Sequence, residues 1–139
     1  MTPDAMAALH ARAFTDQRPW TATEFASLLA SPHTVLVTDP MGFLLGRVLA
    51  GEAEVLTLAV DPDAQRQGRA RRLMTRFLAD ATANGATQAF LDVAADNTAA
   101  RALYTHAGFR AAGRRRAYFA RAAGPAVDAI VMARELPDS

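Results

Sequence analysis

The sequence predicts an α/β (α+β) fold with one mixed β-sheet flanked by helices. A continuous apolar, β-branched run over residues 55–60 is typical of a strand that is covered on both faces. Apolar residues then recur at helical spacing over residues 70–81, and a second short apolar run covers residues 89–93. A strand, a crossover helix and another strand imply parallel pairing. Two earlier runs, over residues 33–38 and 43–50, are joined by a turn and are expected to pair antiparallel.

The composition limits the classes of function. The 139 residues fit one domain, and a content of 51% hydrophobic and 21% charged residues is that of a soluble globular protein. No apolar run could span a bilayer and no signal-peptide pattern is present, so the expected location is the cytoplasm. The absence of cysteine excludes disulfides, cysteine metal sites and a cysteine acyl-enzyme. All 15 basic residues are arginine, which excludes a Schiff-base lysine, and a net charge of +1 gives no global attraction to nucleic acid.

Two helix starts are marked near the N-terminus. The Thr2-Pro3 pair predicts a first helix over residues 3–14. Thr21 and Glu24 fit a capping box that begins a second helix. Trp20 precedes this box, at the position from which a hydrophobic staple packs on the first turn of the helix.

The second half of the chain continues the alternation of helices and strands. Asn84-Gly85 ends the long central helix, because glycine adopts the left-handed cap conformation at low cost. Asp96-Asn97 begins the next helix and Gly108 ends it. The last two strands are predicted over residues 114–120 and 128–135.

A glycine-bearing basic loop joins the central strand to the helix that follows it. Gly68 lies within the loop of residues 65–70 and lets another group approach the backbone closely. The start of a helix also presents free N–H groups and the positive end of its dipole. Together with five arginines that crowd the loop, these features favour a cradle for a phosphate-rich anion over an ordinary turn with a solvated basic helix face. The arginines around this loop are Arg66, Arg69, Arg71, Arg72 and Arg76.

Two motifs carry a resemblance to a known family. Gln65-x-x-Gly68-x-Ala70, directly after a strand that ends Ala-Val-Asp-Pro, resembles the acetyl-CoA pyrophosphate loop of the GNAT superfamily of N-acetyltransferases. Residues 97–104, followed by Gly108-Phe109, resemble the second motif of that superfamily. Within the superfamily, the chain is most similar to the bacterial ribosomal-protein alanine N-acetyltransferases. The further segments that support this similarity are residues 18–20, 52–54, 115–119 and 128–132.

The resemblance implies a single N-acetyltransferase domain over residues 1–139, with acetyl-CoA as co-substrate and no metal. Superfamily members usually begin with a strand, but only Met1 and Thr2 precede the first helix here, so that strand is expected to be missing or vestigial. The sheet is expected to splay after its central strand, with the pantetheine of the cofactor in the gap. The residues implied in cofactor binding are Leu58, Ala59, Val60, Gln65, Arg66, Gln67, Gly68, Arg69, Ala70, Asn97 and Tyr104.

Tyr104 is the candidate acid that protonates the departing thiolate, by its place in the second motif. A phenol has an unperturbed pKa near ~10, so it keeps a proton to donate at neutral pH. The alternative is that Tyr104 simply packs on the inner face of its helix. Asn97 also has two interpretations, a helix N-cap and, by the resemblance, a cofactor contact.

Glu54 and Asp92 are the two candidates for the base. Glu54 opens the central strand, where some branches of the superfamily have a catalytic glutamate. Asp92 stands where the similar subfamily usually has a glutamate, and its side chain is one methylene shorter. Either could instead be structural, Glu54 facing solvent and Asp92 bonded to a neighbouring backbone group. A water could also relay the proton to Asp92.

The acceptor amine is expected to be an N-terminus. An α-amine has an unperturbed pKa near ~8 and a lysine near ~10.4, so a weak base position is more compatible with an N-terminal acceptor. The resemblance places Trp20 and Tyr118 at the acceptor, although the staple also explains Trp20 and a place in the core could explain Tyr118. The histidines lack metal-ligand spacing or a nucleophile partner and are interpreted as structural or surface residues; they are His10, His33 and His106.

The leading function is acetyl-CoA-dependent acetylation of a protein N-terminus by direct transfer in a ternary complex. The resemblance points to a small-subunit ribosomal protein with an N-terminal alanine. The alternatives are acetylation of a small amine and a non-catalytic acyl-CoA-binding module. The presence of Tyr104 argues against the non-catalytic module. The expected partners are acetyl-CoA and the acceptor, without nucleic acid or membrane, and the chain is expected to be a monomer or homodimer.

Overall fold

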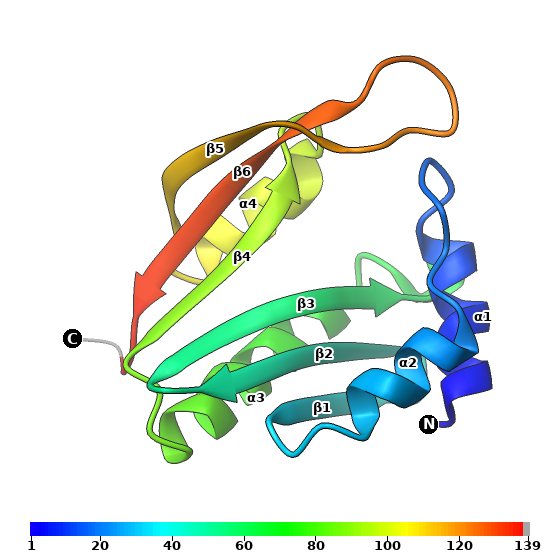
Figure 1. The fold of residues 1–139 in the computed structure, drawn as a ribbon. Coiled ribbons are helices and arrows are strands. Elements are labelled where there is room, and N and C mark those ends of the chain that lie inside the picture. The colour runs from blue at the N-terminus through cyan, green and yellow to red at the C-terminus, as the bar shows by residue number, and fades with distance from the viewer. Residues whose placement is uncertain (138–139) are drawn as a thin grey trace.

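The computed structural model describes residues 1–137, which form one sheet with helices on both of its faces (Figure 1). The elements in chain order are α1 (Pro3–Ala13), α2 (Ala22–Leu29), β1 (Thr34–Asp39), β2 (Gly42–Leu49), β3 (Glu52–Val60), a short 3₁₀ helix η1 (Pro62–Ala64), α3 (Arg69–Ala83), β4 (Gln88–Ala94), α4 (Thr98–His106), β5 (Arg110–Phe119) and β6 (Val127–Glu135). The sheet has six strands in the order β1-β2-β3-β4-β6-β5, and its single parallel pair is β3 with β4. The predicted mixed sheet is therefore confirmed.

Both N-terminal helices begin with the caps that the sequence predicts. The hydroxyl of Thr2 accepts a hydrogen bond from the first turn of α1, and Thr21 and Glu24 form the reciprocal capping box of α2. Trp20 packs on Phe25 with ring centroids 5.5 Å apart, as a staple does. Within residues 1–137 the first element is α1, so the strand that usually opens superfamily members is missing there, as expected from the two residues that precede the helix.

The strand β5 is longer than predicted. It begins at Arg110, whereas the sequence pattern indicated a start at residue 114. The side chains of residues 110–118 are all exposed, so this stretch lacks the apolar alternation that marks a half-buried strand. Its conformation comes from backbone pairing with β6, which covers the segment from Arg110 onward.

The sheet divides between β3 and β4. These strands pair only from Glu52 to Glu54, opposite Gln88 to Phe90. Beyond that point β3 stays with β2 up to Val60, while β4 stays with β6, and the two arms diverge as a V (Figure 1). The main-chain groups in the second half of β3 therefore have no strand partner on their β4 side.

Each face of the sheet has its own apolar cluster. The larger cluster joins α3 to the sheet and also packs against α4, and the smaller one lies under α1 and α2. A bulge separates the pairs Leu45–Thr57 and Gly46–Val55, so Leu56 is the extra residue of β3. This extra residue reverses the alternation, and Val55 belongs to the α3 cluster. Thr57 is thereby turned toward the α1–α2 face.

Candidate active site

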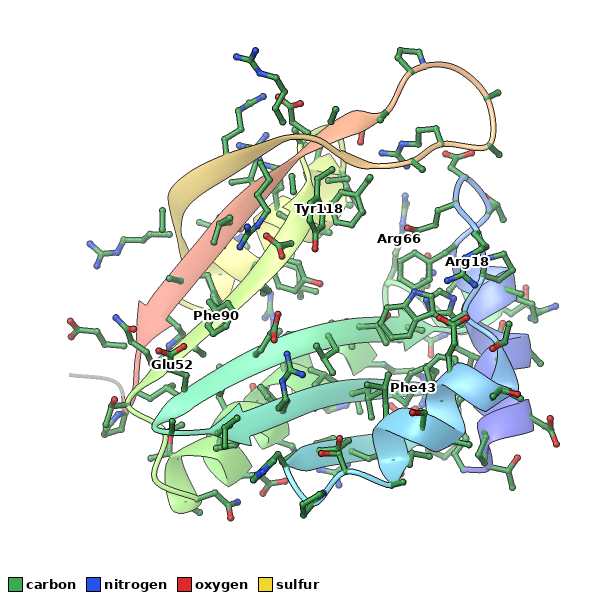
Figure 2. The ribbon with its side chains drawn as sticks, in the orientation of Figure 1. Arg18, Phe43, Glu52, Arg66, Phe90 and Tyr118 are labelled. Atoms are coloured by element: carbon green, nitrogen blue, oxygen red, sulfur yellow. The ribbon has the colours of Figure 1, made fainter. Side chains whose placement is uncertain are left out.

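A cavity of about 970 Å³ opens where β3 and β4 separate, and we call it the split cavity. On the α3 face its walls come from the loop before α3 and from α4. On the α1–α2 face they come from the segment between α1 and α2 and from the end of β5. Figure 2 shows Arg66 and Tyr118 on opposite sides of the opening between the two arms of the sheet. The cavity therefore offers room for two reactants that approach from different faces.

The loop before α3 has the backbone conformation of an anion cradle. Gly68 has a φ of +76° and Arg66 a φ of +63°, both in the left-handed region. No side chain caps the first turn of α3, so its N–H groups remain available. The Gln65 side chain donates from Nε2 to the carbonyl oxygen of Val60 across 3.1 Å and ties the loop to the end of β3. This geometry suits a bound phosphate.

The arginines near this loop have different roles. Arg69 pairs with Asp39 at 3.4 Å, and Arg72 donates to the carbonyl oxygen of Gln67 at 3.1 Å. Arg76 donates to the carbonyl oxygen of Thr38 at 2.8 Å. Of the five arginines around the loop, Arg72 and Arg76 therefore bind backbone carbonyl oxygens. The two arginines that line the split cavity and have no partner within residues 1–137 are Arg66 and Arg71.

The predicted pantetheine segment lies along the open edge of β3. Leu58 and Val60 line the split cavity, whereas the side chain of Ala59 is buried in the cluster under α1 and α2. Ala59 can therefore offer only its main chain to a ligand. Gln67 does not line the cavity, and its side-chain oxygen accepts a hydrogen bond from Arg69.

Tyr104 projects from α4 into the wall of the split cavity. Its ring meets Phe109 edge to face with centroids 6.2 Å apart. Burial raises the pKa of Tyr104 to about 12, because the phenolate would lose its hydration. Tyr104 thus keeps its proton at neutral pH, as an acid must.

Asn97 also lines the cavity, and its Oδ1 accepts the N–H of Ala100 at 3.1 Å as the N-cap of α4.

Asp92 lines the split cavity and is paired with a cation. Its Oδ1 accepts from Nε of Arg115 on β5 across 3.0 Å. Within residues 1–137 Asp92 makes no hydrogen bond to a backbone group, which was the alternative to a role as base, and is bonded to the arginine instead. The carboxylate therefore stands at the cavity with its charge balanced.

Glu54 lies outside the walls of the split cavity. It stands in the part of β3 that still pairs with β4, opposite Phe90, and its carboxylate is paired with Arg47 of β2. Figure 2 shows Glu52 and Phe90 at this closed end of the V. One interpretation of the sequence had Glu54 facing solvent at the end of the strand, but its carboxylate is ion-paired. Its side chain also does not line the split cavity.

The two predicted acceptor contacts differ in position. Trp20 lines the split cavity, but Tyr118 does not and is 52% exposed. The register of β5 shifts between Arg115 and Phe119, and Ala117 within that shift has a φ of +50°. This irregularity places Phe119 in the cavity wall, and Tyr118 instead lies beside the guanidinium of Arg115.

Several wall residues were not identified from the sequence. His10 and Thr57 are the two polar side chains that the structure buries within residues 1–137, and both line the split cavity. Two segments also meet across the α1–α2 side of the cavity, where the N–H of Ala122 donates to the carbonyl oxygen of Asp16 at 2.9 Å. No local pattern signals these features, because each depends on elements far apart in the chain.

Two further observations concern residues 1–137. No group of three or more His, Cys, Asp or Glu side chains there could hold a metal ion. No helix in this part of the chain is long and apolar enough to cross a membrane.

Comparisons with known proteins agree with this geometry. A model of the acetyltransferase (GNAT) family matches residues 4–109. The [ribosomal protein bS18]-alanine N-acetyltransferase of Escherichia coli is 35% identical over 136 residues, covering 95% of this chain and 91% of that protein. The N-alpha-acetyltransferase RimI of Mycobacterium tuberculosis is 39% identical over 141 residues, covering 95% of this chain and 85% of that protein. The crystal structure of the ribosomal-protein-S18-alanine N-acetyltransferase from Escherichia coli has a TM-score of 0.87 at 32% identity, covering 99% of this chain and 89% of that one.

Proposed function

Because this chain belongs to the acetyltransferase (GNAT) family and is an acetyl-CoA-dependent N-acetyltransferase, we propose that the amine it acetylates is a protein N-terminus. The proposed acceptor is the N-terminal alanine of a small-subunit ribosomal protein of the bS18 type. The name of the similar Escherichia coli enzyme supports this acceptor, and the name of the similar Mycobacterium tuberculosis enzyme supports an N-terminal α-amine. We further propose that residues 1–139 act as one catalytic domain in the cytoplasm.

The observation that carries the proposal is the main-chain bridge across the acceptor side of the split cavity. The hydrogen bond between Ala122 and Asp16 joins the β5–β6 loop to the segment between α1 and α2. A chain end can enter beneath such a bridge, whereas an internal segment would have to continue on both sides of it. This favours a terminal α-amine over a residue within a chain.

The proposed cofactor site lies on the other side of the split. The N–H groups around Gly68 and the start of α3 would hold the pyrophosphate, with Arg66 and Arg71 close by. The open main chain of residues 58–60 would pair with the pantetheine. Asn97 would add a contact from the start of α4.

The proposed chemistry uses Tyr104 and Asp92. The acceptor nitrogen forms its bond to the acetyl carbon, the carbon–sulfur bond breaks, and Tyr104 gives its proton to the departing sulfur. The apolar surroundings that raise the pKa of Tyr104 also disfavour a bare thiolate beside it, which assists this transfer. A water held by Asp92 takes the proton that the amine loses and passes a proton to the Asp92 carboxylate. Trp20 would contact the acceptor directly, and Tyr118 would stand at the outer rim.

A small-amine acceptor has less support. Two of the three carboxylates that line the cavity, Asp92 and Asp96, are paired with Arg115 and Arg121, so the wall offers little free negative charge to a polyamine. The test is a transfer assay with acetyl-CoA against N-terminal peptides and small amines. We expect the highest kcat/KM on a peptide that begins with alanine. A small amine that exceeds every peptide would contradict the proposal.

A further inference from the structure

His10 is a buried titratable side chain for which the proposed chemistry has no role. It lies on α1, is 1% exposed and lines the α1–α2 side of the split cavity. Burial lowers the pKa of His10 to about 4, so its ring is neutral at physiological pH. Nearby Glu24 raises this pKa and Arg18 lowers it, and both effects are smaller than that of burial.

The hydrogen bond at Nδ1 fixes which nitrogen of His10 carries the proton. The backbone N–H of Trp20 donates to Nδ1 of His10 across 3.3 Å. A neutral imidazole has one donor and one acceptor nitrogen, so Nε2 carries the hydrogen. Nε2 has no hydrogen-bond partner within residues 1–137, yet no fully buried side-chain nitrogen or oxygen there lacks one. Nε2 therefore reaches the cavity.

Three aromatic rings hold the imidazole of His10 in place. Its ring centroid lies 4.5 Å from that of Phe14, 5.2 Å from that of Trp20 and 5.7 Å from that of Phe25. The direction of the Nε2–H bond is thus fixed before any substrate arrives. A fixed donor loses little conformational freedom when it binds an acceptor atom.

The same geometry excludes His10 as the base. Nδ1 is occupied by Trp20 and Nε2 already carries a hydrogen, so neither nitrogen can take a proton from the acceptor amine. What remains is a hydrogen-bond donor at the acceptor end of the cavity. A peptide N-terminus presents a matching group next to its amine, namely the carbonyl oxygen of its first residue, and a simple alkyl amine presents none.

We propose that His10 is a specificity-determining residue whose Nε2–H donates to the carbonyl oxygen of the first acceptor residue. This inference rests on the proposed N-terminal acceptor. A site built to hydrogen-bond its substrate rejects analogues without the partner, because its own polar group is then left unpaired. His10 would thereby favour a peptide N-terminus over an amine that has no neighbouring carbonyl.

The test compares the parent, His10→Phe and His10→Gln on an alanine-initiated peptide and on isopropylamine. Phenylalanine keeps the aromatic packing and loses both hydrogen bonds, whereas glutamine can accept from Trp20 and still donate into the cavity. We expect His10→Phe to raise KM for the peptide by roughly 10- to 100-fold with little change in kcat or in KM for acetyl-CoA. Its kcat/KM on isopropylamine should fall by less than about threefold, and His10→Gln should recover much of the peptide KM.

Equal losses on the peptide and on isopropylamine would overturn the inference, because a purely structural role affects both acceptors. A parent enzyme that acetylates no N-terminal peptide would defeat the proposed function, and the inference with it. If His10→Phe does not fold, a peptide with a thioamide at its first bond gives a second test on the parent. Its sulfur is a weak acceptor, so KM should rise, and an unchanged KM contradicts the inference.

Discussion

Arg115 donates from Nε to Oδ1 of Asp92 across 3.0 Å, and its guanidinium lies 5.7 Å from the ring centroid of Tyr118. The Asp92 side chain is 16% exposed, while that of Arg115 is 52% exposed. One oxygen of the carboxylate is therefore engaged from outside the cavity. This arrangement supports the proposal that Asp92 acts through a bound water molecule and does not take the proton from the amine itself.

Asp92→Asn should lower kcat/KM for an N-terminal acceptor at pH 7 by about tenfold, the amide being unable to draw a proton from the water. The loss should shrink toward pH 9, where the acceptor is already neutral. Glu54→Gln is the matched control, because Glu54 is also ion-paired but lies outside the split cavity. Initial rates against pH check both variants, and a larger loss in Glu54→Gln would assign the base to Glu54.

Gly68→Val should abolish most of the thermal stabilisation that acetyl-CoA gives. Acetyl-CoA at 100 times its Kd should stabilise the folded parent by about 2.7 kcal/mol, and most of this stabilisation should be lost in Gly68→Val. Gly85→Val is the control, since Gly68 and Gly85 have φ values of +76° and +87° at opposite ends of α3. Both variants should lose stability, but only Gly68→Val should lose the response to acetyl-CoA. Equal thermal stabilisation of the two variants by acetyl-CoA would exclude this loop as the pyrophosphate site.

The sequence predicts most of the local structure because its signals are local. The capping box at Thr21, the turn at Gly85 and the loop around Gly68 each depend on a few adjacent residues. The extent of the split between β3 and β4 depends on main-chain pairing, for which no side chain is specific. The resemblance to the GNAT superfamily implied this split, whereas the residue patterns alone could not have predicted it.

The positions of several site residues depend on distant contacts. Phe119 lines the split cavity and Tyr118 does not, because β5 shifts register where Ala117 adopts a positive φ, which its identity does not signal. His10 is an isolated histidine on an amphipathic helix until Trp20 closes over it. Arg76 reaches a carbonyl oxygen 38 residues away in sequence. In each case tertiary contacts determine where the side chain lies, and the neighbouring residues in the sequence do not indicate these contacts.

Tyr104→Phe should reduce kcat by roughly 10²- to 10⁴-fold with little loss of acetyl-CoA affinity, because the ring stays and only the proton donor is removed. With a pKa of about 12, Tyr104 stays protonated throughout the range from pH 6 to pH 10. The loss should therefore be uniform over that range and should not shift the profile. Tyr118→Phe, which changes the other tyrosine of the chain, should keep kcat within about threefold. An unchanged kcat in Tyr104→Phe, with chemistry rate-limiting, would exclude Tyr104 as the acid.

His10 should make the fold sensitive to mild acid. The pKa of His10 is about 4 in the folded state and near 6.5 when unfolded, so between these values the unfolded chain binds more protons. Its contribution to stability is complete above about pH 6.5 and is lost as the pH falls toward 4. The parent should therefore lose about 4–8 °C more of its Tm than His10→Phe between pH 7 and pH 5.

This pH window separates His10 from the carboxylates. The hydrogen bond from Arg18 lowers the pKa of Glu24 to about 2, so Glu24 affects stability at lower pH. The pKa values of Asp61 and Asp128 are also lowered, by Arg12 and by the N–H of Ala117. Thermal melts at pH 5, 6 and 7 provide the measurement. Parallel curves for the parent and His10→Phe would show that the ring is not buried in its neutral form.

The bridge between Ala122 and Asp16 should govern the choice between a terminal amine and a lysine. Proline has no N–H, so Ala122→Pro removes the donor of this bond. We expect the parent to acetylate a peptide with a free N-terminus and to neglect an internal lysine in an N-terminally blocked peptide of otherwise identical sequence. The parent rate should rise toward about pH 8, where the α-amine becomes neutral.

In Ala122→Pro the ratio of N-terminal to lysine acetylation should fall by at least about fivefold, because the acceptor side is then open to a continuing chain. Ala123→Pro is the control, since it puts proline in the same loop and leaves the N–H of Ala122 in place. Mass spectrometry of the two peptides after reaction gives the ratio for each protein. Efficient lysine acetylation by the parent would defeat the N-terminal assignment. An equal fall in both proline variants would show that loop rigidity matters and the bridge does not.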